Sequence, residues 1–231
     1  MSLPLLALGA VALSSSAQAA DDRPAHEFHL VTGSYASGDR HFEFYSPLNN
    51  IGSSGARLGI GLKGPWTLTA GYTRRTVVSE YFNSLVESNN DELDRDDAAL
   101  ITGFTGQQVT LGPKFQIDPK PWLGTYITTQ GLLFMGTSRL DDDPTTDDNR
   151  NQLKAFDWAP GFVAAAGVQL NPQIRRSPVQ LSSFLEMGYN WTAALKLTDE
   201  NIGEHGTNEP ASMGELTFRG YYLQAGVGIK F

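Results

Sequence analysis

The sequence contains no cysteine, which excludes disulfide bonds and cysteine-ligated metal sites. It has little positive charge: 17 Lys and Arg stand against 25 Asp and Glu, for a net charge of −8. Such a chain repels the phosphates of nucleic acids, and no basic stripe offsets the repulsion. A spanning helix needs about 20 consecutive apolar residues, and no such run occurs after residue 20. These absences argue against a nucleic-acid binder and against a helical membrane protein.

The first twenty residues are the one long apolar stretch. Residues 3–13 are apolar, three serines follow, and Ala17-Gln18-Ala19 has the small-x-small pattern of a signal-peptidase site. The pattern predicts a cleaved secretory signal over residues 1–20 and a mature domain over 21–231. A short buried helix is the alternative interpretation.

Beyond residue 21, apolar residues recur at every second position, which is typical of strands with one apolar and one polar face. In the last segment, for example, Val227, Ile229 and Phe231 alternate with Gly228 and Lys230. Most of the segments are longer than the roughly 9–11 residues that a tilted strand needs to cross a bilayer. The eight predicted strands cover residues 27–36, 54–63, 66–79, 100–117, 122–139, 155–170, 179–197 and 215–231.

The connections between these segments alternate in length. Those at 63–65, 118–121 and 171–178 are short and contain proline, whereas those at 37–53, 80–99, 140–154 and 198–214 are long and polar. Short turns at one end and long loops at the other indicate an all-β fold, an eight-stranded antiparallel up-and-down transmembrane β-barrel. A barrel of eight strands has an interior that side chains can just fill. A soluble periplasmic β-sandwich would alternate too and stays an alternative.

Tryptophan and proline test this scheme. Trp66 and Trp122 come next to short turns and Trp158 and Trp191 lie near long loops, as expected for aromatic girdles at two membrane interfaces. Two prolines, at positions 113 and 160, fall inside predicted strands. Since proline removes a ladder hydrogen bond, we expect a bulge or a kink near each of them.

The C-terminal residues resemble the assembly signal of outer-membrane barrel proteins: a polar residue, a glycine, an apolar residue and a terminal aromatic, here Gln224, Gly226, Ile229 and Phe231. At the level of architecture the mature chain is similar to eight-stranded barrels of the OmpA-transmembrane, OmpX and OmpW kind. The resemblance implies a porin-like protein of the Gram-negative outer membrane. It also implies recognition by the barrel-assembly machinery, and outer-membrane lipids and lipopolysaccharide as partners.

Extending the alternation from the last strand gives the side chains expected to face the lumen. Charges placed there must pair or meet water. Arg57 and Glu186 fall at similar heights and are the predicted mid-barrel pair. The lumen is either a sealed network of ion pairs and hydrogen bonds or a narrow path for water or ions. The predicted polar lumen residues are Arg57, Lys63, Lys114, Asp157, Glu186, Gln224 and Lys230.

Acidic residues crowd two of the long loops. Carboxylates at this density could hold divalent cations or share those that bridge lipopolysaccharide phosphates, although no EF-hand spacing is present. A solvated loop is the plainer interpretation. We expect no cofactor, and the weak candidates for a divalent cation are Asp91, Asp94, Asp96, Asp141, Asp142 and Asp143.

The predicted function is structural or concerns surface interaction through the acidic loops, without enzyme activity. The first alternative is a narrow channel for small or hydrophobic solutes, as the likeness to OmpW implies. The second is a lipid-modifying enzyme. Of the four histidines none stands in a catalytic frame of such enzymes, and the loop cluster to test first is His41, Glu43 and Ser46.

Overall fold

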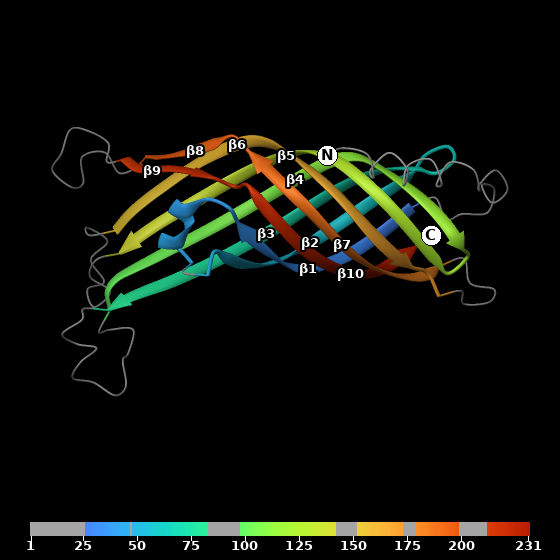
Figure 1. Cartoon of the computed structure of the whole chain (residues 1–231), viewed down its shortest axis with the longest axis horizontal. Coiled ribbons are helices and arrows are strands. Elements are labelled where there is room, and N and C mark those ends of the chain that lie inside the picture. Colours follow the sequence, from blue (N-terminus) through green and yellow to red (C-terminus); the bar gives the residue numbers. More distant parts are fainter. Residues whose placement is uncertain (1–25, 47, 83–97, 142–151, 173–178, 199–211) are drawn as a thin grey trace, which may run out of the picture.

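The computed structural model describes residues 26–46, 48–82, 98–141, 152–172, 179–198 and 212–231. Eight of its strands close into an antiparallel barrel in the order β1-β10-β7-β6-β5-β4-β3-β2 (Figure 1). The predicted fold class is confirmed. Within the described ranges, no helix has both the length and the apolarity to cross a membrane. The elements are β1 (His26–Ser37), η1 (Arg40–Phe44, a 3-10 helix), β2 (Asn50–Gly61), β3 (Trp66–Phe82), β4 (Ala98–Lys120), β5 (Leu123–Asp141), β6 (Gln152–Leu170), β7 (Gln180–Thr192), β8 (Ala194–Thr198), β9 (Ser212–Thr217) and β10 (Gly220–Lys230).

The last strand closes the barrel on the first. β10 runs antiparallel to β1, with Lys230 opposite Glu27 at one end and Gly220 opposite Ser37 at the other. The seam is completed by two 2.9 Å backbone hydrogen bonds between His26 and Phe231. Because every strand of the closed barrel has two partners, no edge is left to pair with another chain along the closed part of the wall.

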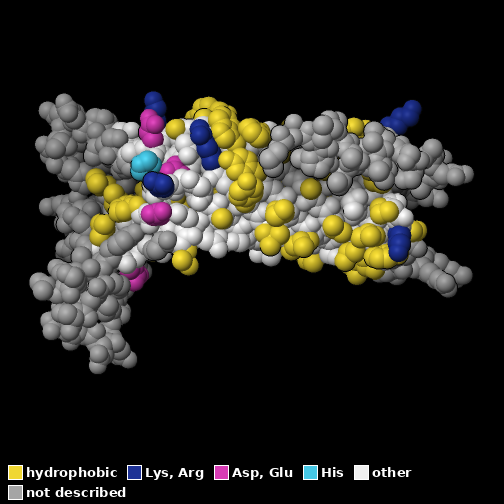
Figure 2. Space-filling model, viewed as in Figure 1, with side chains coloured by type: hydrophobic (Ala, Val, Ile, Leu, Met, Phe, Trp, Pro, Cys, Tyr) yellow, Lys and Arg dark blue, Asp and Glu magenta, His cyan; other side chains and the backbone are white. Residues whose placement is uncertain are grey.

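The barrel is built inside out compared with a soluble protein. On β10, Leu223 and Val227 point outward and are 51% and 64% exposed, whereas Gln224 and Lys230 point inward. The other strands repeat this arrangement, and apolar side chains cover much of the wall in Figure 2. The acidic side chains visible in that view lie near the end that carries η1. An apolar belt around a polar interior requires lipid as its solvent, so the belt is the part of the wall that spans the bilayer.

Aromatic rings border this belt. Trp66 and Trp122 lie beside the short turns, and the Trp66 ring packs against Phe115 with centroids 5.0 Å apart. Towards the other end, Tyr189 packs against Tyr221 at 5.1 Å. Trp158 and Trp191 also lie on this side, so the girdles fall where the sequence places them.

Neither proline produces the expected bulge. Around Pro113 the register between β4 and β5 is the same on both sides, and the Pro113 carbonyl accepts a 3.0 Å hydrogen bond from the Thr128 hydroxyl. Pro160 lies where β7 separates from β6: Ala193 donates to its carbonyl at 2.9 Å, and the proline has no N–H to return. Of the expected bulge or kink, the bulge is absent at both prolines, because one interrupts pairing without shifting the register and the other stands where pairing ends.

This separation divides the two segments predicted as single strands at 179–197 and 215–231. Beyond Thr192 the chain forms β8, which pairs with β9 in a two-stranded hairpin outside the barrel ladder. Leu195, Leu197 and Leu216 of the hairpin are buried. They pack against the interior cluster at the end of the barrel that carries η1 and the long loops, which we call the outer end. η1 itself comes from the predicted 37–53 loop. The hairpin therefore continues β7 and β10 beyond the barrel ladder, beside β6, and turns its buried leucines towards the interior (Figure 1).

Candidate functional site

The centre of the barrel interior is a bidentate ion pair. Nη1 and Nη2 of Arg57, on β2, each donate a 2.7 Å hydrogen bond to one carboxylate oxygen of Glu186, on β7. The Glu186 side chain is fully buried, and the guanidinium also lies 4.7 Å from the centre of the Phe184 ring. Two side chains 129 positions apart in sequence are thus joined across the lumen.

Glu186 has further donors around it. The hydroxyls of Tyr126 and Tyr222 donate to it at 2.9 and 2.8 Å, and the side-chain amide of Gln224 donates at 2.5 Å. With the two bonds from Arg57, the carboxylate accepts five hydrogen bonds and its lone pairs are fully used. We name these five residues the Glu186 network. Such a saturated buried network fixes the relative positions of the strands that supply it.

A second polar group lies nearer the short turns. The Lys114 ammonium donates to the Glu27 carboxylate and lies 3.4 Å from the amide oxygen of Gln169. The Gln169 amide donates to Glu27 at 3.3 Å and to the Ser182 hydroxyl at 2.7 Å, and Ser182 lies 3.0 Å from Nε2 of His29. β1, β4, β6 and β7 are thereby connected across the lumen at this level.

The outer half of the interior is filled by aromatic rings instead. Phe218, between β9 and β10, lies 4.1 Å from the ring centre of Phe134, 5.0 Å from Phe104 and 5.4 Å from Phe42. All four side chains are at most 1% exposed. We call these four residues the aromatic plug. It closes the lumen with apolar side chains above the polar networks.

Asp39 connects η1 to the β8–β9 hairpin. Its carboxylate accepts 2.7 Å hydrogen bonds from the amide and the hydroxyl of Thr217 and a 3.0 Å bond from the amide of His41. Burial favours the neutral acid, but these donors outweigh it, so the pKa of Asp39 lies below its ordinary value of 3.8. These contacts therefore stabilise the end that carries η1 and the hairpin at pH values above 3.8. The stabilisation is lost as the pH falls through the lowered pKa of Asp39.

Acidification is expected to loosen the β8–β9 hairpin through Asp39. The protection factors of the hairpin amides, which are the intrinsic exchange rate at each pH divided by the measured rate, should fall more steeply between pH 6 and pH 3 in the wild type than in an Asp39→Asn variant. The asparagine side chain cannot titrate, so the hairpin of the variant should show no carboxylate-dependent step. Equal pH profiles for the two proteins would contradict this role of Asp39.

Six of the seven predicted lumen side chains, Arg57, Lys114, Asp157, Glu186, Gln224 and Lys230, face the interior in the structure. The prediction for Lys63 was wrong: it lies exposed in the turn after β2, because the alternation was extended past the end of the strand. Asp157 is on the inner face of β6 but outside the polar networks. It accepts hydrogen bonds from the amides of Trp158 at 2.8 Å and Lys196 at 2.6 Å. Lys196 belongs to β8, so its bond to Asp157 joins the hairpin to the part of β6 that lies beyond the end of β7.

Some interior residues were not predicted. Glu27, Tyr126, Tyr222 and Arg75 all lie on the inward phase of their strands and are buried. Carrying the alternation through the first and third strands would have found Glu27 and Arg75. Nothing in the local pattern distinguishes a tyrosine that faces the lumen from one that belongs to a girdle.

The predicted assembly-signal glycine has a packing role in the folded barrel. A Cβ at Gly226 would lie 2.2 Å from the ring of Phe184, which stands directly opposite on β7. Gly167 makes the same kind of room for the Tyr126 ring, which would be 2.4 Å from an added Cβ. Interior rings therefore lie over glycines of neighbouring strands, which lets a narrow barrel hold them.

Replacing Gly226 by leucine is expected to lower the unfolding free energy by about 1–3 kcal/mol, because Phe184 must leave its place. The measurement is urea unfolding of protein refolded in detergent micelles without any assembly machinery. Ala225→Leu, which introduces the same side chain on the outward face, is the matched control and should change little. An unchanged midpoint for Gly226→Leu would overturn the packing role and leave this glycine to recognition alone.

The acidic loops lie outside the described residues. This applies to Asp91, Asp94, Asp96, Asp142 and Asp143, and for Asp141 only the backbone, at the end of β5, is described. In the part of the chain that the structure does describe, no three His, Asp or Glu side chains are grouped to hold a metal ion.

The fold and its interior define a small transmembrane β-barrel with a filled lumen. No protein-family model matches the chain, and no curated protein matches it. Among solved structures it is similar to Neisserial surface protein A (15% identity, TM-score 0.48, 91% of this chain and 100% of that one). It is likewise similar to a major outer-membrane protein of Thermus thermophilus (10%, 0.49, 90% and 98%).

A further similar structure is Ail, the attachment invasion locus protein of Yersinia pestis, in complex with the heparin analogue sucrose octasulfate. The identity is 14%, the TM-score 0.46, and the match covers 89% of this chain and 97% of Ail. The predicted eight-stranded architecture is confirmed by the closed barrel of the structure itself.

Proposed function

We propose that this chain is a non-conducting integral protein of the Gram-negative outer membrane that acts through its outward end, by structural support or surface interaction. The observation that carries the proposal is the filled interior. The Glu186 network occupies the middle of the lumen and the aromatic plug the outer half. A channel would instead need a continuous polar path past both.

The proportions of the strands support action at the outer end. β4 has 23 residues and β5 and β6 have 19 each, about twice what a crossing requires. The excess projects beyond the apolar belt, where η1 and the β8–β9 hairpin pack against it. The long acidic segments of the sequence connect these projecting strands, so divalent cations and lipopolysaccharide phosphates are the partners we propose for them.

Conductance decides between this proposal and the channel alternative. Purified protein reconstituted into planar bilayers should give no channel steps, whereas steady single-channel currents from the wild type would contradict the proposal. The interaction role is tested separately by replacing the aspartates at 91, 94 and 96, or at 141–143, with asparagine. Binding to lipopolysaccharide vesicles in Mg²⁺ should weaken in these variants and not in Asp118→Asn, at the opposite end.

We also propose that the protein is not an enzyme. Of the loop cluster considered for catalysis, His41 is paired with Asp39 at 3.1 Å, and the buried Ser46 hydroxyl donates to the carbonyl of Asn50. A general base must reach the proton it removes, and the Ser46 hydroxyl donates its proton to a backbone carbonyl rather than to the His41 imidazole. Lipid A and phospholipid profiles should be identical in strains with and without the gene. A changed profile would refute this part of the proposal.

A further inference from the structure

Arg75, on β3, is a buried cation without a counter-ion. Its side chain faces the lumen and is 4% exposed, and Nε and Nη1 have no hydrogen-bond partner. Its contacts are with aromatic faces: the guanidinium carbon lies 4.4 Å from the centre of the Tyr35 ring and 5.9 Å from that of Phe134. Since a guanidinium cannot lose its proton in a protein, the charge stays and needs compensation.

The described carboxylates of the interior are committed elsewhere. Glu186 is saturated by its own network, and Glu27 is engaged by Lys114 and, at 3.9 Å, by Lys230. Asp157 lies in the same register row as Arg75 but three strands away, where it accepts two backbone amides. Within the described part of the chain, Arg75 forms no ion pair with any of them.

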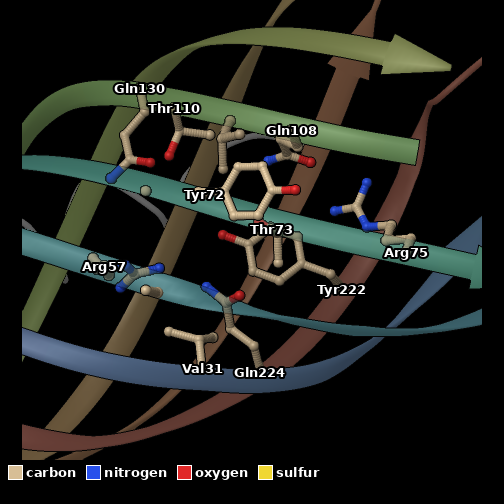
Figure 3. A pocket seen from close by; sticks show the side chains of 13 residues that line it. Val31, Arg57, Tyr72, Thr73, Arg75, Gln108, Thr110, Gln130, Tyr222 and Gln224 are labelled. Atoms are coloured by element: carbon tan, nitrogen blue, oxygen red, sulfur yellow. The ribbon is translucent and has the colours of Figure 1, made fainter. Parts of the chain in front are cut away.

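The guanidinium lines a cavity of about 30 Å³ in the middle of the barrel, room for roughly two water-sized species. Figure 3 shows Arg57 and Arg75 at opposite sides of this space, with Tyr222 and Gln224 between them. The Thr110 hydroxyl and the Gln108 amide line the same cavity and can donate into it, whereas the donors of Arg57, Tyr222 and Gln224 go to Glu186.

We propose that this cavity binds a small inorganic monoanion, with chloride as the fitting example, held by Nε and Nη1 of Arg75. The anion supplies the charge that the described carboxylates do not, and donors such as the Thr110 hydroxyl complete its shell. A polyatomic sugar sulfate or a lipid phosphate is too large for the volume. The site goes beyond the proposed function, because it adds an exchangeable bound anion to the core of the non-conducting barrel.

Bromide is the probe for the site in the full-length protein. Crystals grown in sodium bromide should show an anomalous peak beside the Arg75 guanidinium. In detergent solution, the thermal midpoint of the wild type should rise with sodium chloride relative to sodium gluconate at equal ionic strength. An Arg75→Met variant should lose chloride affinity by about tenfold or more, as expected when charged hydrogen bonds are removed.

Arg74→Met is the matched control, because Arg74 is the neighbouring residue on the same strand and is exposed on the outer face. It removes the same charge and should keep the chloride dependence. Equal chloride dependence in the wild type and Arg75→Met, or the absence of bromide density beside Arg75, would overturn the proposal. If Arg75→Met does not fold, the wild-type bromide map alone decides. Bilayer conductance is not involved, so failure here leaves the proposed function standing.

Discussion

Replacing Glu186 by glutamine is expected to lower the unfolding free energy by about 3–5 kcal/mol, which is the usual cost of removing one member of a buried ion pair. The neutral amide leaves Arg57 uncompensated. It also turns an NH₂ group towards donors, where the carboxylate accepts from Tyr126, Tyr222 and Gln224. Urea unfolding of the refolded barrel, followed by its heat-modifiable shift on gels, measures the change.

Two comparisons sharpen this experiment. Glu80→Gln, an exposed glutamate on β3, should shift stability by less than about 0.5 kcal/mol. The double variant Arg57→Met with Glu186→Leu should be more stable than Glu186→Gln, because it removes both charges and leaves none unpaired. If Glu186→Gln unfolds at the wild-type midpoint, the pair does not hold the barrel together.

Removing the Phe218 ring is the second substitution with a large expected effect. Phe218→Ala should cost about 3–5 kcal/mol, since a fully buried ring is lost from the centre of the aromatic plug. The loss of structure should affect the β8–β9 hairpin before it affects the barrel. Hydrogen exchange in β8 and β9 should rise before that of the barrel strands, because the plug is what the hairpin packs against.

Leu48→Ala is the control at the same end of the molecule, since Leu48 is 87% exposed. It should leave both stability and hairpin exchange nearly unchanged. Phe218→Ala should also be tested for channel currents in planar bilayers, because Phe218 lies at the centre of the plug that closes the lumen. If its hairpin amides remain as protected as in the wild type, the plug does not hold the hairpin in place.

Much of the architecture could be predicted because the alternation along each strand shows which face meets lipid. Leu223 and Val227 point outward and Gln224 and Lys230 inward for a reason that is local: successive side chains of a strand point to opposite sides. Turn and loop lengths then order the strands. The errors came where a strand stops: Lys63 lies past the end of β2, and β7 ends where Pro160 has no N–H to offer.

The sequence by itself determined the number of barrel strands, the inward or outward direction of most side chains and the acidic character of the loops. Only the tertiary structure decided which inward side chains meet. Glu186 on β7 gathers residues from β2, β5 and β10, and Phe218 gathers rings from η1, β4 and β5. Closing the sheet brings these residues together across the lumen, and an alternation read along one strand holds no information about the strand opposite. For the same reason, only the closed barrel shows that Arg75 has no described carboxylate to pair with.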